Sequence, residues 1–256
     1  MSVLTRNSKV MMRGGCVLVG SGASWYPKGV ALTVSLPMTI STVNPPLDES
    51  GCGHAPEIGT YVAYEYDPVD PTIQSDITLQ GAQYAGYTPE HARWNFGMSN
   101  SWNTLSGCSF AIEADVYLPS GALTTTWEWS KNIIYGGGGP GSGCPQFGVG
   151  VVDGAPRLLM GDGTGVVETF SSPDEFPLDE WVNVGVAFDL ARKTAQLRMN
   201  GEIVAKRTQE SAFTESGNWR EYNLGSAEWN EWVGTDPLYS WAMWWKGYIC
   251  NFKLYK

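Results

Sequence analysis

Short segments of alternating apolar and polar residues, separated by glycine- and proline-rich turns, constrain the fold of this 256-residue chain more than any other feature. The clearest is WVNVGVAFDL, residues 181–190, in which every second residue from Val182 to Leu190 is a large apolar one. A period of two is that of a β-strand with one buried face. Further segments rich in strand-forming residues are 60–67, 109–118, 131–137, 146–152, 157–162, 195–199, 202–208 and 248–256.

No long stretch combines helical periodicity with capping residues. Many short strands with alternating faces are typical of two packed sheets, so we predict an all-β, two-sheet antiparallel sandwich. The clearest turn is Asn200-Gly201, which lies between two strand-like runs. Both residues tolerate positive φ, so this pair predicts a tight hairpin.

The charge of the chain is acidic overall, and its few basic residues gather at the start. Net charge is −10, and charged residues make up only 16% of the sequence. Nucleic-acid binding needs clustered Lys and Arg, and no such stripe is present, so we expect no nucleic-acid partner. Four basic residues precede the first acidic one, Asp48. A basic arm on an acidic body indicates a docking segment, or a chance bias in a short stretch.

We divide the chain into three parts. KVMMRGGCVLV predicts a small hairpin with Gly14-Gly15 near its turn, within an N-terminal arm of residues 1–22. An isolated hairpin is marginally stable, so the arm is expected to anchor the chain to a partner through Arg6, Lys9 and Arg13. A proline-rich connector is expected at 23–57, and one large domain at 58–256.

Export and membrane signals are not evident in the sequence. No segment forms an apolar signal region or approaches the ~20 apolar residues of a membrane span, so we expect a chain made in the cytosol without membrane insertion. The cysteines are Cys16, Cys52, Cys108, Cys144 and Cys250. Their number is odd and no C-x-x-C pair occurs, so we interpret them as free thiols rather than as a disulfide framework or zinc site, with a single bridge as the open alternative.

Three segments together resemble the laminin-G-like, or concanavalin-A-like, jelly-roll domains. FPLDEWVNVGVAFDLARKTAQLRMNGEIVAKRT resembles their central hairpin, SFAIEADVYLPSG an early strand, and WKGYICNFKLYK the closing strand after a G-x-I start. The resemblance covers about residues 58 to 256. It implies a jelly roll with one convex and one concave sheet, and ligand sites on the concave face or the rim loops. Because lectins, adhesive modules, glucanases and polysaccharide lyases share this fold, it leaves the activity open.

A short hairpin arm ahead of such a domain loosely resembles the virion-anchoring ends of tailed-phage fibre and decoration proteins. That resemblance implies a virion-associated head-fibre, tail-fibre or decoration protein without a secretion signal. The arm would bind a capsid or other virion protein. Location on a virion is therefore expected, with an extracellular location otherwise, and a homo-oligomer is possible for such fibres.

The stretch FAIEADVYL, residues 110–118, contains the main enzyme candidates. Its alternation places Glu113, Asp115 and Tyr117 on one face of a strand. Jelly-roll β-glucanases carry E-x-D-x-E on the concave face, and here the last glutamate is replaced by Tyr117, a poor acid at neutral pH. Three interpretations stay open: catalysis by Glu113 and Asp115, a polar lining of a ligand groove, and a solvated sheet face. A lyase would need His or Lys near a Tyr, and the only histidines are His54 and His91.

Tryptophans are the stronger functional signal. Six of them fall within residues 219–245, and Trp127 and Trp129 share one face of TWEWS. Aromatic faces stack on sugar rings, and they equally serve in cores and interfaces. The predicted ligand-binding residues are Glu113, Asp115, Tyr117, Trp127, Trp129, Trp229, Trp232 and Trp241.

Calcium is the one metal that the sequence suggests. Asp153 and Asp162 lie in the loops of VVDGAPRLLMGDGTG, although Asp-Gly is first of all a turn signal, so no cofactor is expected. We predict a non-enzymatic, virion-associated adhesion protein whose jelly roll binds surface glycan. The alternative is a polysaccharide-degrading glycoside hydrolase or lyase of the same fold.

Overall fold

The computed structural model describes most of a β-sandwich. The described residues are 9–13, 16–20, 25–36, 48–54, 79–80, 94–98, 105–120, 131–138, 145–161, 167–208, 221–230, 240–245 and 247–256. All strand pairs within them are antiparallel, and no helix long and apolar enough to cross a membrane occurs among them. The predicted strand at 60–67 lies outside these residues.

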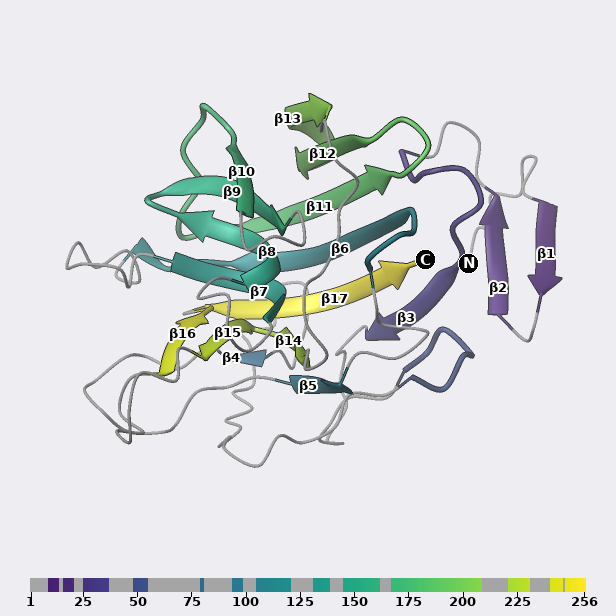
Figure 1. Cartoon of the computed structure of the whole chain (residues 1–256). Coiled ribbons are helices and arrows are strands. Elements are labelled where there is room, and N and C mark those ends of the chain that lie inside the picture. Colours follow the sequence, from purple (N-terminus) through teal and green to yellow (C-terminus); the bar gives the residue numbers. More distant parts are fainter. Residues whose placement is uncertain are drawn as a thin grey trace.

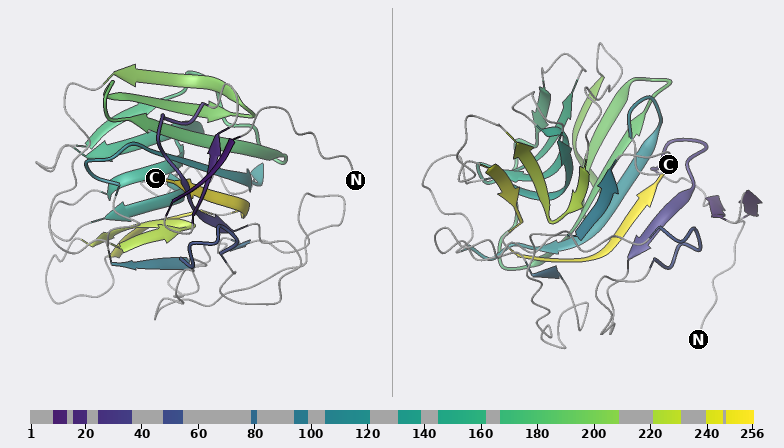
Figure 2. Two further views of the ribbon diagram at one scale, coloured as in Figure 1. Left: turned by 90° about the vertical axis from the view of Figure 1, so that its right-hand side faces the viewer. Right: turned by 60° about the horizontal axis from the view of Figure 1, so that its bottom comes forward.

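Two large sheets are stacked face to face (Figures 1 and 2). The six-stranded sheet has the order β10 (Val167–Ser171), β9 (Ala155–Gly161), β8 (Pro145–Val152), β7 (Lys131–Gly138), β14 (Glu221–Leu224) and β5 (Trp94–Met98). The seven-stranded sheet has the order β13 (Glu202–Thr208), β12 (Thr194–Met199), β11 (Trp181–Asp189), β6 (Phe110–Tyr117), β17 (Tyr248–Tyr255) and β3 (Leu32–Leu36), and β4 (Leu79–Gln80) also pairs with β17. The predicted all-β, two-sheet antiparallel sandwich is thus confirmed.

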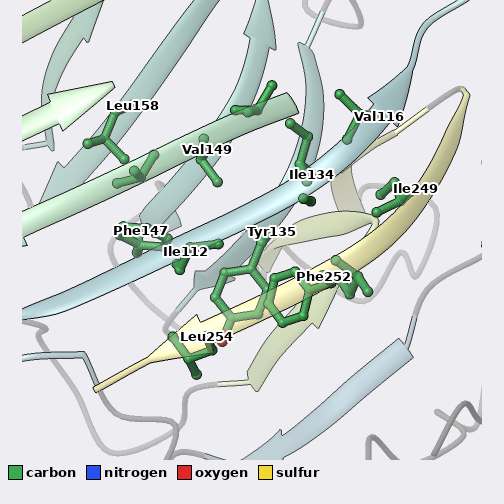
Figure 3. Close-up of a cluster of buried hydrophobic side chains, with 14 of the residues drawn as sticks. Ile112, Val116, Ile134, Tyr135, Phe147, Val149, Leu158, Ile249, Phe252 and Leu254 are labelled. Carbon is green, nitrogen blue, oxygen red and sulfur yellow. The ribbon is translucent and has the colours of Figure 1, made fainter. Parts of the chain in front are cut away.

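The core lies between the two sheets and is formed by alternate residues of their strands. In β11, Val182, Val186 and Phe188 are fully buried and Val184 nearly so, as the period of two predicts. Residues of β6 and β17 meet Phe147, Val149 and Leu158 of the opposite sheet (Figure 3). Aromatic rings fill the centre of the core. The ring of Tyr135 stacks on that of Tyr222 with centroids 5.7 Å apart, and its centroid lies 5.0 Å from that of Phe252.

Both predicted hairpins are present. Asn200 and Gly201 have φ of 48° and 85°, and Met199 pairs directly with Glu202, which is the geometry of a two-residue turn between β12 and β13. Near the N-terminus, β1 (Lys9–Arg13) pairs with β2 (Cys16–Gly20), with Arg13 opposite Cys16. A second small ladder, which the sequence did not indicate, joins β15 (Ser226–Asn230) to β16 (Ser240–Trp244).

The predicted connector, 23–57, does not lie apart from the sandwich. Its residues 32–36 form β3, which pairs with the C-terminal strand β17 at the edge of the seven-stranded sheet (Figure 1). Ala31 and Lys256 also exchange both backbone hydrogen bonds, at 2.9 and 2.8 Å. The sheet therefore begins earlier than the predicted domain start at residue 58.

The cysteines correct a second expectation. Cys52 is disulfide-bonded, whereas Cys108 and Cys250 are free. The favoured interpretation as free thiols was therefore wrong for Cys52, which takes part in the kind of single bridge that the sequence left open. An odd number of cysteines does not exclude a bridge, because pairing depends on which residues the fold brings together.

The glycine that opens the closing strand gives a test of the fold. A Cβ at Gly247 would collide with the carbonyl oxygen of Tyr117, so Gly247→Ala is expected to destabilise the fold by about 2–3 kcal/mol. Gly201→Ala has free space around the added methyl and only a positive φ to oppose it, so we expect about 1 kcal/mol. Urea unfolding followed by circular dichroism measures both. Equal losses for the two variants would contradict the close approach of Gly247 to β6.

Candidate functional site

Strand β6 sends its side chains alternately into the core and onto the outer face of the seven-stranded sheet. Phe110, Ile112, Ala114 and Val116 are buried in the core, whereas Glu113, Asp115 and Tyr117 are half-buried on the outer face. The register places Gly185, Asn183 and Trp181 of β11 beside these three residues. On the other side, β17 places Lys253 beside Glu113. The three predicted polar residues therefore lie at the centre of a sheet face.

Glu113 is surrounded by hydrogen-bond donors of the protein. Its Oε1 accepts from Lys253 Nζ at 2.9 Å and from Tyr255 OH at 3.2 Å, and its Oε2 accepts from Tyr26 OH at 2.8 Å. Only 12% of the Glu113 side chain is exposed. A buried carboxylate is costly unless it is paired, and this one is paired on both oxygens.

The segment 25–31, which we call the strap, covers this half of the outer face. Trp25 lies over Gly185, where an added Cβ would come within 2.8 Å of Trp25 Cη2, and the Arg198 guanidinium lies 5.2 Å from the Trp25 ring centroid. Tyr26 stacks on Tyr255 with ring centroids 4.2 Å apart. A glycine inside a strand weakens that strand, and the close approach of Trp25 explains why position 185 nevertheless carries a glycine.

Burial changes the acidity of the two phenols that contact Glu113. Burial raises the pKa of Tyr255 to about 12, and the negative charge of Glu113 acts in the same direction. Burial likewise raises the pKa of Tyr26 well above its usual value, and its contacts with Tyr255 and Glu113 raise this pKa further. Both phenols therefore remain hydrogen-bond donors to Glu113. A carboxylate held by two phenols and an ammonium is poorly placed to attack a substrate.

Asp115 has a different environment, formed by two amides. Asn183 Nδ2 donates to Asp115 Oδ1 at 2.8 Å, and Asn251 Nδ2 donates to Asp115 Oδ2 at 2.7 Å. Asn251 reaches this position from a β-bulge, because the β17–β6 register shifts between Cys250 and Lys253. Its φ is 50°, a left-handed conformation that is unusual inside a strand.

An aromatic pair adjoins this amide–carboxylate group. Tyr117 and Trp181 occupy paired positions of β6 and β11, and their ring centroids are 5.9 Å apart. Both side chains are half-buried. The indole Nε1 of Trp181 is buried and has no hydrogen-bond partner within the described part of the chain.

The predicted tryptophans are distributed differently. Trp229 and Trp241 occupy directly paired positions of β15 and β16, a register that places both on the same face of that ladder. Trp127, Trp129 and Trp232 lie outside the described residues. Trp245, from the same late cluster, is fully buried and packs edge-on against Phe176 at 6.2 Å. At least one late tryptophan therefore belongs to the core.

The remaining candidates lie elsewhere. Asp153 is in the turn between β8 and β9 with φ 54° and faces Arg157 at 3.5 Å, whereas Asp162 is outside the described residues. No group of three or more potential metal-ligating side chains occurs among the residues that the structure describes. His54 belongs to the 48–54 loop, where its backbone N–H donates to Asp48 and burial lowers the pKa of its imidazole. His91 lies outside the described residues.

The anchoring candidates are only partly placed. Lys9 and Arg13 are the end residues of β1, and Arg6 precedes the described part of the chain. Their predicted role in anchoring stays a prediction.

Several residues that shape this face were not predicted from the sequence. Asn183 alternates with the apolar residues of β11, so a correct pairing of β6 with β11 would have located it beside Asp115. Trp25, Tyr26, Lys253 and Asn251 come from distant segments, and no local pattern indicates their contacts.

Comparison with known proteins places the fold among binding domains. No family model and no curated protein matches the sequence. The binding domain of Paraclostridial Mosquitocidal Protein 1 has a TM-score of 0.57 at 12% identity, over 88% of this chain and 48% of that chain. The binding domain of Botulinum neurotoxin DC, in complex with rat synaptotagmin II, has a TM-score of 0.55 at 10% identity, over 88% and 48%.

A third solved structure is matched over nearly its whole length. Domain 4 of AbnA, a GH43 extracellular arabinanase from Geobacillus stearothermophilus, in complex with arabinotriose, has a TM-score of 0.54 at 15% identity, over 89% of this chain and 93% of that chain. The chain spans about half the length of the two toxin domains. At these identities the likeness shows the fold alone, a β-sandwich shared with receptor-binding and carbohydrate-binding domains.

The contact between Trp25 and Gly185 can be tested by a double-mutant cycle. Gly185→Ala is expected to displace Trp25 and lower the free energy of unfolding by about 1–2 kcal/mol, because the added methyl occupies the position of the indole. In a Trp25→Ala background the same substitution is expected to cost nothing measurable. Urea unfolding of the four variants gives the coupling energy. Additive losses would show that the strap does not rest on Gly185.

Proposed function

We propose that this chain is a non-catalytic glycan-recognition module that is held on a virion or comparable particle by its N-terminal arm. The non-catalytic assignment rests on the hydrogen bonds that engage both carboxylate oxygens of Glu113. Both oxygens of this carboxylate accept hydrogen bonds from Lys253, Tyr255 and Tyr26, and the strap lies over it. A glycosidase nucleophile or acid needs direct access to the glycosidic bond, which this arrangement does not offer.

The recognition of glycan is supported by the fold. One solved structure of similar fold is bound to arabinotriose, and another concerns a botulinum neurotoxin whose cell entry depends on two ganglioside molecules. The half-buried polar and aromatic residues of the outer face and the paired positions Trp229 and Trp241 offer the stacking and hydrogen-bonding groups that sugars require. A disulfide at Cys52 supports a site of action outside the reducing cytosol.

Binding and cleavage can be separated with one purified protein. We expect retention on a glycan array without release of reducing sugars from β-glucans or of unsaturated products from polyuronates. Glu113→Gln is compared with Glu202→Gln, an exposed glutamate of the same sheet. Sugar release that Glu113→Gln abolishes and Glu202→Gln preserves would establish the hydrolase alternative. Absence of retention on every glycan would overturn the recognition proposal.

The arm is proposed to bind an acidic surface of a capsid or other virion protein, through the basic side chains of the β1–β2 hairpin and the residues before it. We expect the triple change Arg6→Glu, Lys9→Glu and Arg13→Glu to abolish co-sedimentation with the particle, because it reverses the charge of the arm. The matched control reverses Lys193, Lys206 and Arg207, which are exposed on or beside the edge strand β13. Equal incorporation of both variants would refute anchoring by the arm.

A further inference from the structure

We infer that Asp115, Asn183 and Asn251, with the adjoining rings of Tyr117 and Trp181, form a subsite for a neutral saccharide. The inference rests on the proposed function and narrows its ligand class. The five residues come from the three central strands β11, β6 and β17, and they lie on the half of the outer face next to the strap-covered residues. We call them the Asp115 subsite.

The hydrogen bonds of the subsite fix its polar atoms and leave several available. Each amide donates one N–H to a different oxygen of Asp115, so both amide planes are oriented by the same carboxylate. Neither amide oxygen has a hydrogen bond within the described part of the chain, and neither is buried. The subsite therefore presents two oriented carbonyl acceptors, their remaining N–H donors and the free lone pairs of Asp115.

The backbone at Asn251 indicates that this arrangement is specifically built. A left-handed residue inside a central strand costs about 1 kcal/mol or more, and glycine would adopt φ 50° at less cost. The bulge at this point keeps Phe252 in the core while it directs the Asn251 amide to Asp115. β-Bulges that re-aim a side chain in this way concentrate next to functional sites.

The aromatic pair supplies the apolar part of a sugar site. Tyr117 follows Asp115 by two residues on β6, and Trp181 precedes Asn183 by two residues on the antiparallel β11, so the aromatic pair lies about 6.7 Å along the strands from Asp115 and Asn183. A saccharide that spans this distance contacts the aromatic rings and the amide oxygens together.

The charges of this face select a neutral ligand. Asp115 is the charged group at the centre of the subsite, and it repels a uronate or sialic acid carboxylate. The two cations beside the subsite, on the neighbouring positions of β17 and β12, already interact with other groups of the protein. Lys253 Nζ lies 2.9 Å from Glu113, and Arg198 donates to the Gly201 carbonyl at 2.7 Å and lies over Trp25. Hydroxyl groups, which donate to carboxylate and carbonyl oxygens, are the chemistry that this set of acceptors recognises.

The test measures binding of the full chain to neutral oligosaccharides (arabinotriose, cellotriose, laminaritriose and mannotriose) and to charged ones (sialyllactose and tri-galacturonate). Calorimetry is expected to give affinity for at least one neutral sugar and at least tenfold weaker binding of the charged ones. Asn251→Gly, which suits the left-handed backbone and removes the amide, is expected to weaken neutral binding at least tenfold. Asp153→Gly, the same kind of change at a left-handed residue of the other sheet, is expected to leave it unchanged.

The outcomes separate the inference from the function on which it rests. Asn183→Ala serves as the second variant, and thermal unfolding of each variant shows whether the fold is kept. Neutral binding that survives in folded Asn251→Gly and Asn183→Ala, or a preference for the charged sugars, overturns the subsite and leaves glycan recognition standing. If no saccharide in either group binds, both the subsite and the proposed recognition of glycan are wrong.

Discussion

The buried carboxylate of Glu113 is the interaction on which the outer face of this protein depends. A carboxylate that is 12% exposed requires partners, and here they come from two segments far from β6 in the sequence: the strap and the C-terminal strand β17. The hydrogen bonds to Glu113 therefore hold the N-terminal strap next to the C-terminal strand β17. Tyr26 and Tyr255 are stacked by the same contact, and Trp25 is carried over Gly185. The strap is thereby tied to β6 and β17, and the adjoining strand β3 pairs with β17 at the edge of the sheet.

Two carboxylates on one strand thus acquire different roles from their surroundings. Glu113 accepts hydrogen bonds from two phenols and an ammonium, so it links β6 to the strap and to β17. Asp115, two residues away, is held by two amides whose oxygens accept no hydrogen bond from the described residues. The difference arises in β17, where a bulge brings Asn251 to Asp115 and Lys253 to Glu113. The strap covers one half of the face, and the other half holds the proposed Asp115 subsite.

Local patterns predicted the features that depend on neighbours in sequence. The period of two in 181–190 located β11 and its buried face, and Asn200-Gly201 located a tight turn. The edge strand β3 was placed in a connector, because prolines surround it and its partner lies more than 200 residues away. The sequence left one disulfide bridge open but did not identify Cys52 as a member, since pairing of cysteines depends on distant segments.

The sequence by itself determined that this chain forms a two-sheet sandwich and that Glu113, Asp115 and Tyr117 share one face, because alternation and turn chemistry act over a few residues. Only the tertiary structure decided what those residues meet. The donors to Glu113, the amides on Asp115 and the ring beside Tyr117 come from other strands and from the strap. Side chains acquire their chemistry from such neighbours, and strand pairing together with the packing of the strap brings them into contact.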